Sequence, residues 1–579
     1  MHQRRVIVLK FGGSALRDER SLPRAVAEVD RWRREGYAVV AVVSALHGQT
    51  DRLLAEAHRH AERPEPGALA ALVATGEQAA AAALALVLDR AGVGARAFDA
   101  ASAGLRTTGD PLDSHLVSAR AEALCAAFAL DQVAVVPGFV GRDAQGRTTL
   151  LGRGGSDYTA LFLASCLGAR CRLVKDVPGV FDRDPGAAGA RRLAAVSWAD
   201  AEVLGGRVLQ PKALRFAAER RLSFEVAALD ADDRTVVGPG PTRTGGQPTQ
   251  TAPLRVACLG AGVVGLGVLQ HLLARPEQFE VVGVAVRDPA AAVARGAPCQ
   301  HVTTDGGALA RSECDVVFEA LGGAEPAASW LEAAFERGRR VVTVNKSAVS
   351  RSRDRLERAA QEGGGTLTCS GAVGGATPVL ARAARLREER GVVAVEAVLN
   401  GTTNFVLDRI AEGSTLADAV REAQERGFAE ADPTTDLDGT DSAEKLSILA
   451  GEAFGVSIAP EDVERHGVFG VDAALSAAAH DRGKTVRLVA SLRRTGAGLE
   501  AVVAPREVAA DGWLGGVREE WNAAAFRCED GSTVRVRGRG AGRWPTAQAA
   551  LADLLALRRR ATDAAPIVAT APVEAGAAL

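Results

Sequence analysis

The stretch from Leu254 to Arg275, LRVACLGAGVVGLGVLQHLLAR, decides the fold of the second half of the chain. Its first six residues predict a short strand, and VLQHLLAR predicts a helix. Between them GAGVVG has the spacing GxGxxG: the first glycine permits a tight turn, the second lets a pyrophosphate approach, and the third lets helix and strand pack closely. The helix N-terminus supplies an anion site. We therefore expect a Rossmann fold whose dinucleotide contacts include Gly260, Gly262, Val263, Val264 and Gly265.

The next strand-like run, FEVVGVAVRDP, ends where a Rossmann fold contacts the ribose of its cofactor. It places Arg287 there, with Asp288 beside it. An arginine at this point suits a 2′-phosphate, so the sequence favours NADP(H), with NAD(H) as the alternative.

Length and composition narrow the class of protein. A chain of 579 residues is too long for one core and suggests two to four domains. Its 47% hydrophobic and 24% charged content is that of a soluble globular protein. A net charge of −2 and two tyrosines give no basic or aromatic footprint for nucleic acid. The eight cysteines form no CxxC pair, so neither a zinc site nor a disulfide framework is indicated.

No targeting or membrane segment is evident in the sequence. The N-terminus, MHQRRVIVLKFGGS, has too few apolar positions for a signal peptide. The longest apolar stretch, Ala79 to Leu88, is half the length needed to span a bilayer. We expect a cytoplasmic protein that acts on small molecules, with no membrane partner.

One segment, Gly238 to Ala252 (GPGPTRTGGQPTQTA), has the composition of a linker. Before it the strand-like runs VIVLK, AVVAVVS, VAVVPGF and CRLVKDV alternate with helical stretches, as in a mainly parallel α/β domain. After it the strand–helix pattern restarts.

The chain has six lysines against 63 arginines. Arginine cannot give up its proton and spreads its charge over a plane, whereas lysine is a compact, titratable ammonium. A lysine here can mark a position where arginine would fail, or be left over from biased coding. Only the last of the six lacks a suggestive setting; they are Lys10, Lys175, Lys212, Lys346, Lys445 and Lys484.

Acidic residues crowd the loop GFAEADPTTDLDGTDSAEKL, where a helix is expected to begin near Asp441. Asp441 and Lys445 are spaced i, i+4, so they share one helical face. The pair could be an ordinary surface ion pair, and the loop could resemble a calcium site. The DxDxDG spacing of a calcium loop is absent, and the chain avoids lysine on its other helices.

Residues 253–560 resemble homoserine dehydrogenase, through GAGVVG, TVNKS, LNGTTNFVL, the acidic loop and RGRGAGRWPTA. The resemblance implies NAD(P)H-dependent interconversion of L-aspartate 4-semialdehyde and L-homoserine. It implies that Lys445 donates a proton to the carbonyl oxygen, which needs an acid as hydride arrives. The other roles it implies are substrate binding by Glu430, Asp436 and Asp441, a place facing the reacting centre for Lys346, and closure over the cofactor by Gly540.

One departure from the dehydrogenase pattern affects metal binding. Ser370 stands where the family often has a glutamate that helps to hold a monovalent cation. A Na⁺ or K⁺ site would then rest on backbone carbonyls near Val373 and Gly375.

In the first half, VIVLKFGGS predicts a strand with Lys10 near its end, followed by a glycine turn. The lysine and the glycine amides suit a phosphate-binding loop, but the spacing is not that of a Walker A loop. A second glycine turn, LGRGGSD, opens a helix. Ser156 or Asp157 could be an ordinary N-cap there, and Arg153 offers carboxylate recognition.

Residues 4–236 resemble aspartokinase of the amino-acid kinase fold, through KFGGS, VVSALHGQTD, ATGEQ, PGFVGRDAQGRTTLLGRGGSDYTA, DVPGVFDRDP and VLQPKAL in that order. The resemblance implies phosphoryl transfer from MgATP to the side-chain carboxylate of L-aspartate. Implied ATP contacts are Lys10, Gly12, Gly13, Asp176, Phe181 and Lys212, with Asp157 organising the transfer site. Implied aspartate contacts are Ser44, Thr50, Glu77, Arg153 and Ser156.

Departures from the kinase pattern gather around the expected adenine and phosphate contacts. Lys175 replaces Thr or Ser, Phe181 replaces Tyr, Gly186 replaces a basic residue, and Gln210 replaces the His of VLHP. Arg191 or Arg192 could compensate for the lost contacts.

Together the two halves indicate an α/β bifunctional aspartokinase–homoserine dehydrogenase, on the route from aspartate to threonine and methionine. The alternative is a dehydrogenase whose kinase-like half is a degenerate scaffold or a sensor. The family resemblance implies a homo-oligomer, a dimer or tetramer. The expected segments are a kinase domain (1–237), a linker (238–252), a Rossmann domain (253–375), an α+β substrate and dimerisation domain (376–530), a segment returning to the nucleotide domain (531–560) and a disordered tail (561–579).

The short linker leads to a prediction about regulation. Fused enzymes of this kind carry ligand-binding regulatory domains between the two activities, and about fifteen residues are too few to fold one. We therefore expect neither L-threonine nor L-lysine to inhibit either activity. Inhibition by millimolar amounts of these amino acids in steady-state assays would refute this expectation.

Overall fold

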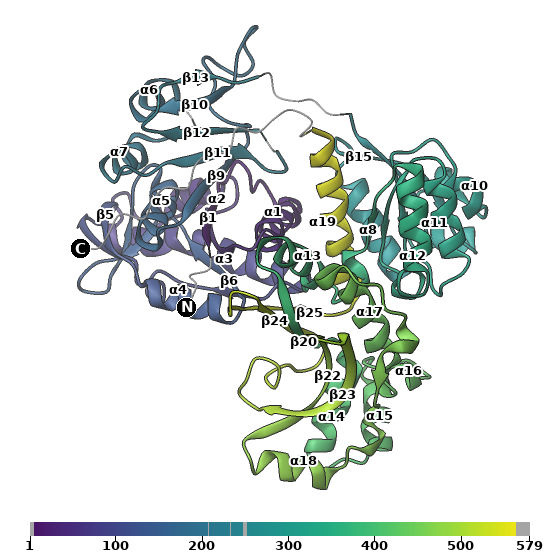
Figure 1. Ribbon diagram of the computed structural model, residues 1–579. Helices are drawn as coiled ribbons and strands as arrows, with labels where there is room; N and C mark the ends of the chain where they lie inside the picture. Colours follow the sequence, from purple (N-terminus) through teal and green to yellow (C-terminus); the bar gives the residue numbers. More distant parts are fainter. Residues whose placement is uncertain (1–4, 207, 232, 247–251, 563–579) are drawn as a thin grey trace. The chain divides into compact units, whose positions relative to one another are not determined.

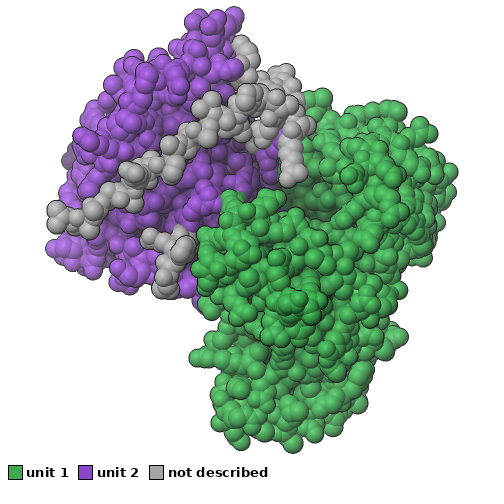
Figure 2. All heavy atoms as spheres, viewed as in Figure 1, with its two compact units in different colours: residues 1–2, 91–93, 251–558 green, residues 3–90, 94–250, 559–579 purple. Residues whose placement is uncertain are grey.

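The computed structural model describes residues 5–206, 208–231, 233–246 and 252–562 (Figure 1). The chain divides into two compact units (Figure 2). The N-terminal unit comprises residues 3–90, 94–250 and 559–579, and the C-terminal unit comprises residues 1–2, 91–93 and 251–558. Each contains a largely parallel sheet with helices, which confirms the predicted α/β class.

The N-terminal unit is built on a nine-stranded sheet with the order β13-β10-β12-β11-β9-β1-β2-β6-β3. Its central strands are parallel and mostly buried, β2 and β6 throughout their length, which explains their apolar runs. The strands are β1 (Val6–Phe11), β2 (Ala38–Val43), β3 (Ala95–Ala97), β6 (Val133–Pro137), β9 (Arg170–Lys175), β10 (Leu193–Ser197), β11 (Phe224–Ala228), β12 (Arg234–Gly238) and β13 (Arg243–Thr244).

The described part of this unit also contains seven complete α-helices and a small four-stranded sheet. The helices are α1 (Leu22–Arg34), α2 (Gln49–His60), α3 (Pro66–Arg90), α4 (Ala121–Ala129), α5 (Gly155–Leu167), α6 (Trp198–Leu204) and α7 (Pro211–Glu219). The small sheet has the order β5-β4-β7-β8, formed by β4 (Arg106–Asp110), β5 (Asp113–Ser118), β7 (Val140–Arg142) and β8 (Thr148–Leu150).

Helix α3 is longer and more apolar than the run Ala79–Leu88 suggests. Among the described residues it is the one helix that could cross a membrane by length and composition. Its Val73, Leu84 and Leu88 are buried, and the helix contacts β6 and β8. Packing on the sheets therefore explains one face of α3, while Leu86 on the same helix is 71% exposed.

The predicted linker is partly a strand. Residues 243–244 form β13, which pairs antiparallel with β10 at the sheet edge. This pairing joins backbone groups and needs no apolar side chains, so composition does not reveal it. Residues 247–251 lie outside the described residues, as does most of the predicted tail, because α19 (Arg543–Thr562) ends the described chain.

The C-terminal unit contains a six-stranded parallel sheet with the order β16-β15-β14-β17-β18-β19, which is the Rossmann order 3-2-1-4-5-6. Its strands are β14 (Leu254–Leu259), β15 (Phe279–Ala285), β16 (Val302–Thr303), β17 (Val316–Glu319), β18 (Arg340–Thr343) and β19 (Leu367–Thr368). Its helices are α8 (Val263–Leu273), α9 (Pro289–Ala294), α10 (Gly306–Ala310), α11 (Ala327–Phe335) and α12 (Lys346–Gly363).

A second six-stranded sheet in this unit has the order β21-β23-β22-β20-β24-β25. Its strands are β20 (Val392–Val398), β21 (Glu464–Arg465), β22 (Lys484–Thr495), β23 (Gly498–Ala509), β24 (Trp521–Cys528) and β25 (Thr533–Arg539). The helices are α13 (Val379–Glu389), α14 (Gly401–Ala411), α15 (Leu416–Glu425), α16 (Thr434–Leu437), α17 (Thr440–Phe454) and α18 (Ala473–His480). Helix α17 packs on α12 and α13, which brings the acidic loop to the nucleotide fold.

Helix α19 returns to the Rossmann sheet. Ala547 packs so closely on Gly267 of α8 that an added Cβ there would lie 3.0 Å away. Asp553 accepts a hydrogen bond from the Ser370 amide at 3.0 Å, and the Arg340 side chain donates to the Leu557 carbonyl at 3.2 Å. The last helix thus closes a fold that begins almost 300 residues earlier, at Leu254.

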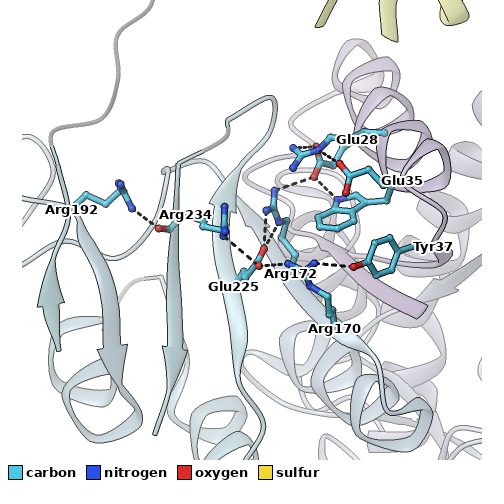
Figure 3. A network of polar contacts seen from close by, with 10 residues as sticks. Glu28, Glu35, Tyr37, Arg170, Arg172, Arg192, Glu225 and Arg234 are labelled. Carbon is cyan, nitrogen blue, oxygen red and sulfur yellow. Dashed lines mark hydrogen bonds and ion pairs between the residues drawn. The ribbon is translucent and has the colours of Figure 1, made fainter. Parts of the chain in front are cut away.

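An ionic network with a buried centre at Arg172 and Glu225 crosses the sheet of the N-terminal unit, while its outer arginines, Arg170 and Arg234, are partly exposed (Figure 3). Glu225 of β11 lies in register with Arg172 of β9 and accepts from its Nε at 2.9 Å. Arg170 donates to the other Glu225 oxygen at 2.7 Å, and Arg234 lies 3.4 Å from that oxygen. Arg172 also reaches Glu28 of α1 at 3.3 Å. The network therefore ties a helix to adjacent strands through charge-assisted hydrogen bonds.

Removing the charge of Glu225 should destabilise this region. In Glu225→Gln three arginines face a neutral amide, so we expect the free energy of local unfolding to fall by about 3 kcal/mol at neutral pH. Hydrogen exchange of the β9 and β11 amides in the full chain measures the change. The exposed pair Glu202–Arg215 provides the control: Glu202→Gln should change protection by less than about 0.5 kcal/mol.

The same comparison has a pH dependence. Burial alone would raise the pKa of Glu225. The attraction of the neighbouring arginines is larger than this effect and lowers the pKa from 4.5 to about 2. A depressed folded-state pKa stabilises the fold fully above the unfolded value, and this contribution is lost as pH falls toward the folded value. The difference between wild type and Glu225→Gln should therefore shrink from pH 4.5 to about 2. A constant difference across this range would contradict the assignment.

Candidate active sites

In the C-terminal unit the carboxylate of Asp441, in the first turn of α17, holds two lysines. Lys445, one turn later, lies 2.7 Å from Asp441 Oδ2 and donates to the Leu399 carbonyl at 2.7 Å. Lys346, the first residue of α12, donates to Asp441 Oδ1. The Asp441 and Lys445 side chains are only 4% and 12% exposed. The interpretation as a surface ion pair is therefore wrong.

Electrostatics keeps these groups charged. Burial alone would raise the pKa of Asp441, but Lys445 and Lys346 hold it below its usual range. Burial opposes the charge of Lys346, yet Asp441 raises the pKa of that lysine above its usual value. The centre consequently carries two ammonium groups around one ionised carboxylate.

Asn400 joins this centre from the start of α14. Its amide donates to Asp441 Oδ2 at 2.8 Å and to Asp436 Oδ1 at 2.6 Å. Burial and the Asp441 charge raise the pKa of Asp436. The Glu430 side chain is exposed and forms no hydrogen bond or ion pair among the described residues, so the structure does not bring it to Asp441. Asn400 lies in the motif LNGTTNFVL, and no role was predicted for it from the sequence.

A second group missed by sequence analysis orients the start of α12. The buried Glu319 accepts from the Asn345 amide at 3.1 Å and from the Leu321 backbone at 2.6 Å, and burial raises its pKa. Asn345 caps α12 by accepting from the Ala348 backbone at 3.1 Å. This arrangement fixes the residue that immediately precedes Lys346.

The glycine turn after β14 fits a dinucleotide. Gly260 has φ +100°, and a Cβ on Gly265 would lie 2.2 Å from the Gly260 carbonyl oxygen. Gly262 caps α8 with no side-chain hydrogen bond, and a Cβ on it would meet open space. Val263 in the first turn is 69% exposed, and Val264 follows it. The free helix N-terminus and the exposed apolar residue suit a pyrophosphate and its neighbouring groups.

At the end of β15, Asp288 and Arg287 differ in availability. Asp288 caps α9 by accepting from the Ala291 backbone at 3.0 Å. Arg287 is exposed and forms no side-chain contact among the described residues. Of these two residues, Arg287 is the one whose side chain is available to a ligand.

Gly540 and the glycine turn of residues 374–375 lie together. A Cβ on Gly375 would lie 2.8 Å from the carbonyl oxygens of Arg539 and Gly540. Val373 beside them is fully buried. Within the described ranges no three His, Cys, Asp or Glu side chains cluster as a metal site, so a monovalent cation here would depend on backbone oxygens.

In the N-terminal unit Asp157, in the first turn of α5, also holds two lysines. Its Oδ1 lies 2.8 Å from Lys10 Nζ and its Oδ2 lies 2.6 Å from Lys175 Nζ. Burial opposes the Asp157 charge, but the two lysines lower its pKa to about 2. Burial and the charge of Lys10 lower the pKa of Lys175. Asp157 acts in the opposite direction but does not cancel this effect. The N-cap of α5 is Gly154, so neither Ser156 nor Asp157 caps the helix.

Glycines and polar groups surround Lys10. A Cβ on Gly12 would lie 3.1 Å from Lys10 Nζ, and one on Gly13 would lie 3.0 Å from the Ala45 carbonyl oxygen. Ser14 donates to Asp176 at 3.1 Å. Glu77 is buried, and burial raises its pKa to about 8.

Lys212 takes a different position. Its ammonium donates to Asp113 at 2.6 Å and to the carbonyls of Leu151 and Ser114 at 2.8 and 2.9 Å. It therefore does not contact Asp157. Gln210 caps α7 by its backbone and packs on Gly154.

The remaining residues predicted for the first half differ in exposure. Ser156 is buried, Ser44, Thr50 and Phe181 are partly buried, and Arg153 is exposed without a side-chain contact among the described residues.

Comparisons with known proteins match both units. The profile "Homoserine dehydrogenase" covers residues 378–555, "Homoserine dehydrogenase, NAD binding domain" covers residues 260–369, and "Amino acid kinase family" covers residues 5–227. The homoserine dehydrogenase of Mycobacterium bovis is 34% identical over 330 residues, which are 54% of this chain and 74% of that protein. That of Corynebacterium glutamicum is 34% identical over 321 residues, 52% of this chain and 72% of that protein.

A solved structure agrees with this match. The homoserine dehydrogenase of Thiobacillus denitrificans superposes with a TM-score of 0.51 at 32% identity, covering 54% of this chain and 74% of that one. The chain therefore belongs to the homoserine dehydrogenase family and carries an amino acid kinase domain ahead of its dehydrogenase domains.

Proposed function

We propose that the C-terminal unit reduces L-aspartate 4-semialdehyde to L-homoserine, and that the N-terminal unit transfers a phosphoryl group from ATP to the side-chain carboxylate of L-aspartate. The observation that carries the proposal is the pairing of two lysines with one buried aspartate in each unit. The matches to homoserine dehydrogenases and to the amino acid kinase family support it.

In the dehydrogenase the bound nicotinamide supplies the hydride. Lys445 has three N–H donors and, among the described residues, uses two, on Asp441 and the Leu399 carbonyl, so the third is available for the substrate oxygen. It gives a proton to that oxygen as negative charge develops, and aldehyde, hydride and proton together make the alcohol. Lys346 supplies a second positive charge, and Asp441, joined to Asp436 through Asn400, is proposed to hold the substrate amino group.

We propose NADP(H) as the preferred cofactor. The Asp288 carboxylate is occupied as a helix cap, whereas Arg287 is free to bind a 2′-phosphate. NAD(H) remains the alternative.

Lys445→Met should lower kcat for homoserine oxidation by about 10²–10⁴-fold, because it removes the proposed acid–base group. NADP(H) binding, followed by fluorescence titration, should stay unchanged. Lys484→Met is the control, since this lysine is 45% exposed and, in the part of the chain that the structure describes, pairs only with Glu507 at 3.5 Å. If Lys445→Met turns over as fast as the control, the acid assignment is wrong.

In the kinase Lys10 and Asp157 form the proposed transfer centre, at the carboxyl end of β1 and the N-terminus of α5. The buried Glu77 is proposed for the amino group of aspartate and Arg153 for a carboxylate. Each oxygen of Asp157 pairs with one lysine, so this carboxylate is proposed to position the two cations.

ATP, Mg²⁺ and L-aspartate should yield ADP with the wild-type chain, and Lys10→Met should lower kcat by about 10²-fold or more, since it removes a charge from the transferred group. A coupled ADP assay measures both, with Lys484→Met as the control. ATP binding without aspartate-dependent ADP release would instead favour the sensor, and loss of both would favour the degenerate scaffold.

A further inference from the structure

Lys175 and Lys10 converge on Asp157 from neighbouring strands. β1 and β9 pair in parallel, with Phe11 opposite Val174, so both lysines lie near the carboxyl edge where ligands bind in open α/β sheets. Each lysine takes one oxygen of the same carboxylate. Asp157 thereby fixes the two ammonium groups side by side.

The centre has an unbalanced charge. Two ammonium groups face one carboxylate, and their side chains are only 7% and 11% exposed. Glu77, which interacts with Lys10, has a pKa raised to about 8 by burial, so it is mostly protonated at neutral pH and adds little negative charge. Asp176, a further acid that acts on Lys175, is exposed, so solvent screens its charge. A buried excess of positive charge is costly unless an anion accompanies it.

The N–H groups of Lys10 and Lys175 that have no partner within the described ranges also indicate that an anion binds between them. An ammonium has three N–H groups, and among the described residues Lys10 and Lys175 each form a single side-chain ion pair. Lys212 contrasts with them, because Asp113 and two carbonyls use all three of its donors. Lys175 has donors to offer where Lys212 has none.

We propose that Lys175 binds the terminal phosphate of a nucleoside triphosphate beside Lys10, in place of Lys212, which is a structural residue. The inference rests on the proposed phosphoryl-transfer function and names the second cation of that site. The glycine turn after Lys10 and the α5 N-terminus, which has no side-chain cap, add backbone amides suited to phosphate oxygens.

In the transfer step the bond between the γ-phosphorus and the β–γ bridging oxygen breaks, and a bond from that phosphorus to the substrate carboxylate oxygen forms. Lys175 stays protonated throughout and neutralises charge on the phosphoryl oxygens and the leaving diphosphate. No proton is exchanged with Lys175, so its contribution is electrostatic.

Calorimetric titration of the full chain with ATP and with AMP tests the proposal. In Lys175→Met, ATP should bind about 10-fold to 100-fold more weakly, because a charge-assisted phosphate contact is lost. AMP, which lacks the terminal phosphates, should bind within about 2-fold of wild type, a difference too small to reflect a lost contact. Lys484→Met should leave both affinities unchanged, and Lys175→Thr serves as a second variant if the methionine variant does not fold.

Two results would overturn the proposal. Equal weakening of ATP and AMP binding would mean that Lys175 only supports the structure. Unchanged ATP affinity with a raised KM for L-aspartate would place Lys175 on the amino-acid carboxylate instead. The affinity ratio needs no turnover, so it decides the role of Lys175 even if the wild-type chain forms no ADP from L-aspartate, a result that would count against the proposed kinase function alone.

Discussion

Two buried carboxylates organise this protein, and each holds a pair of ammonium groups. Asp157 lies in the first turn of α5 and Asp441 in the first turn of α17. Both helices begin after a left-handed glycine, Gly154 and Gly439, that provides no side-chain cap. The partial positive charge of a helix N-terminus favours an ionised aspartate there. A fixed carboxylate can in turn hold lysines from distant segments of the chain in one place.

This arrangement explains why a chain so rich in arginine keeps lysine in its two centres. The planar guanidinium group of arginine can donate to two carboxylates at once, as Arg172 does to Glu225 and Glu28. Two compact ammonium groups can each take one oxygen of a single carboxylate and still have donors left for a ligand. In this chain arginine forms the structural network around Glu225, whereas lysine pairs with the buried carboxylate of each candidate site.

The sequence predicted the Rossmann half well because its signals are local. GxGxxG must follow a strand and open a helix, and β14 and α8 do so. The partners of Lys175 and Lys212 could not be predicted, since Asp157 and Asp113 lie 18 and 99 residues away and only the folded sheet brings them together. The helix-cap interpretation of Asp157 failed because the glycine before the helix already serves as the cap. Strand β13 was missed because an edge strand of two residues has no hydrophobic period.

The packing of α19 on α8 has a consequence for the order in which the protein is made. The Rossmann strands are translated between residues 254 and 368, but Asp553 and Ala547, which complete their surroundings, come from the end of the chain. Domains made first can fold during synthesis, which proceeds at about 5–20 residues per second. The N-terminal sheet is complete before the Rossmann strands leave the ribosome. The contacts of α19 with the nucleotide fold can form only after residues 543–557 have been made, later than the Rossmann strands themselves.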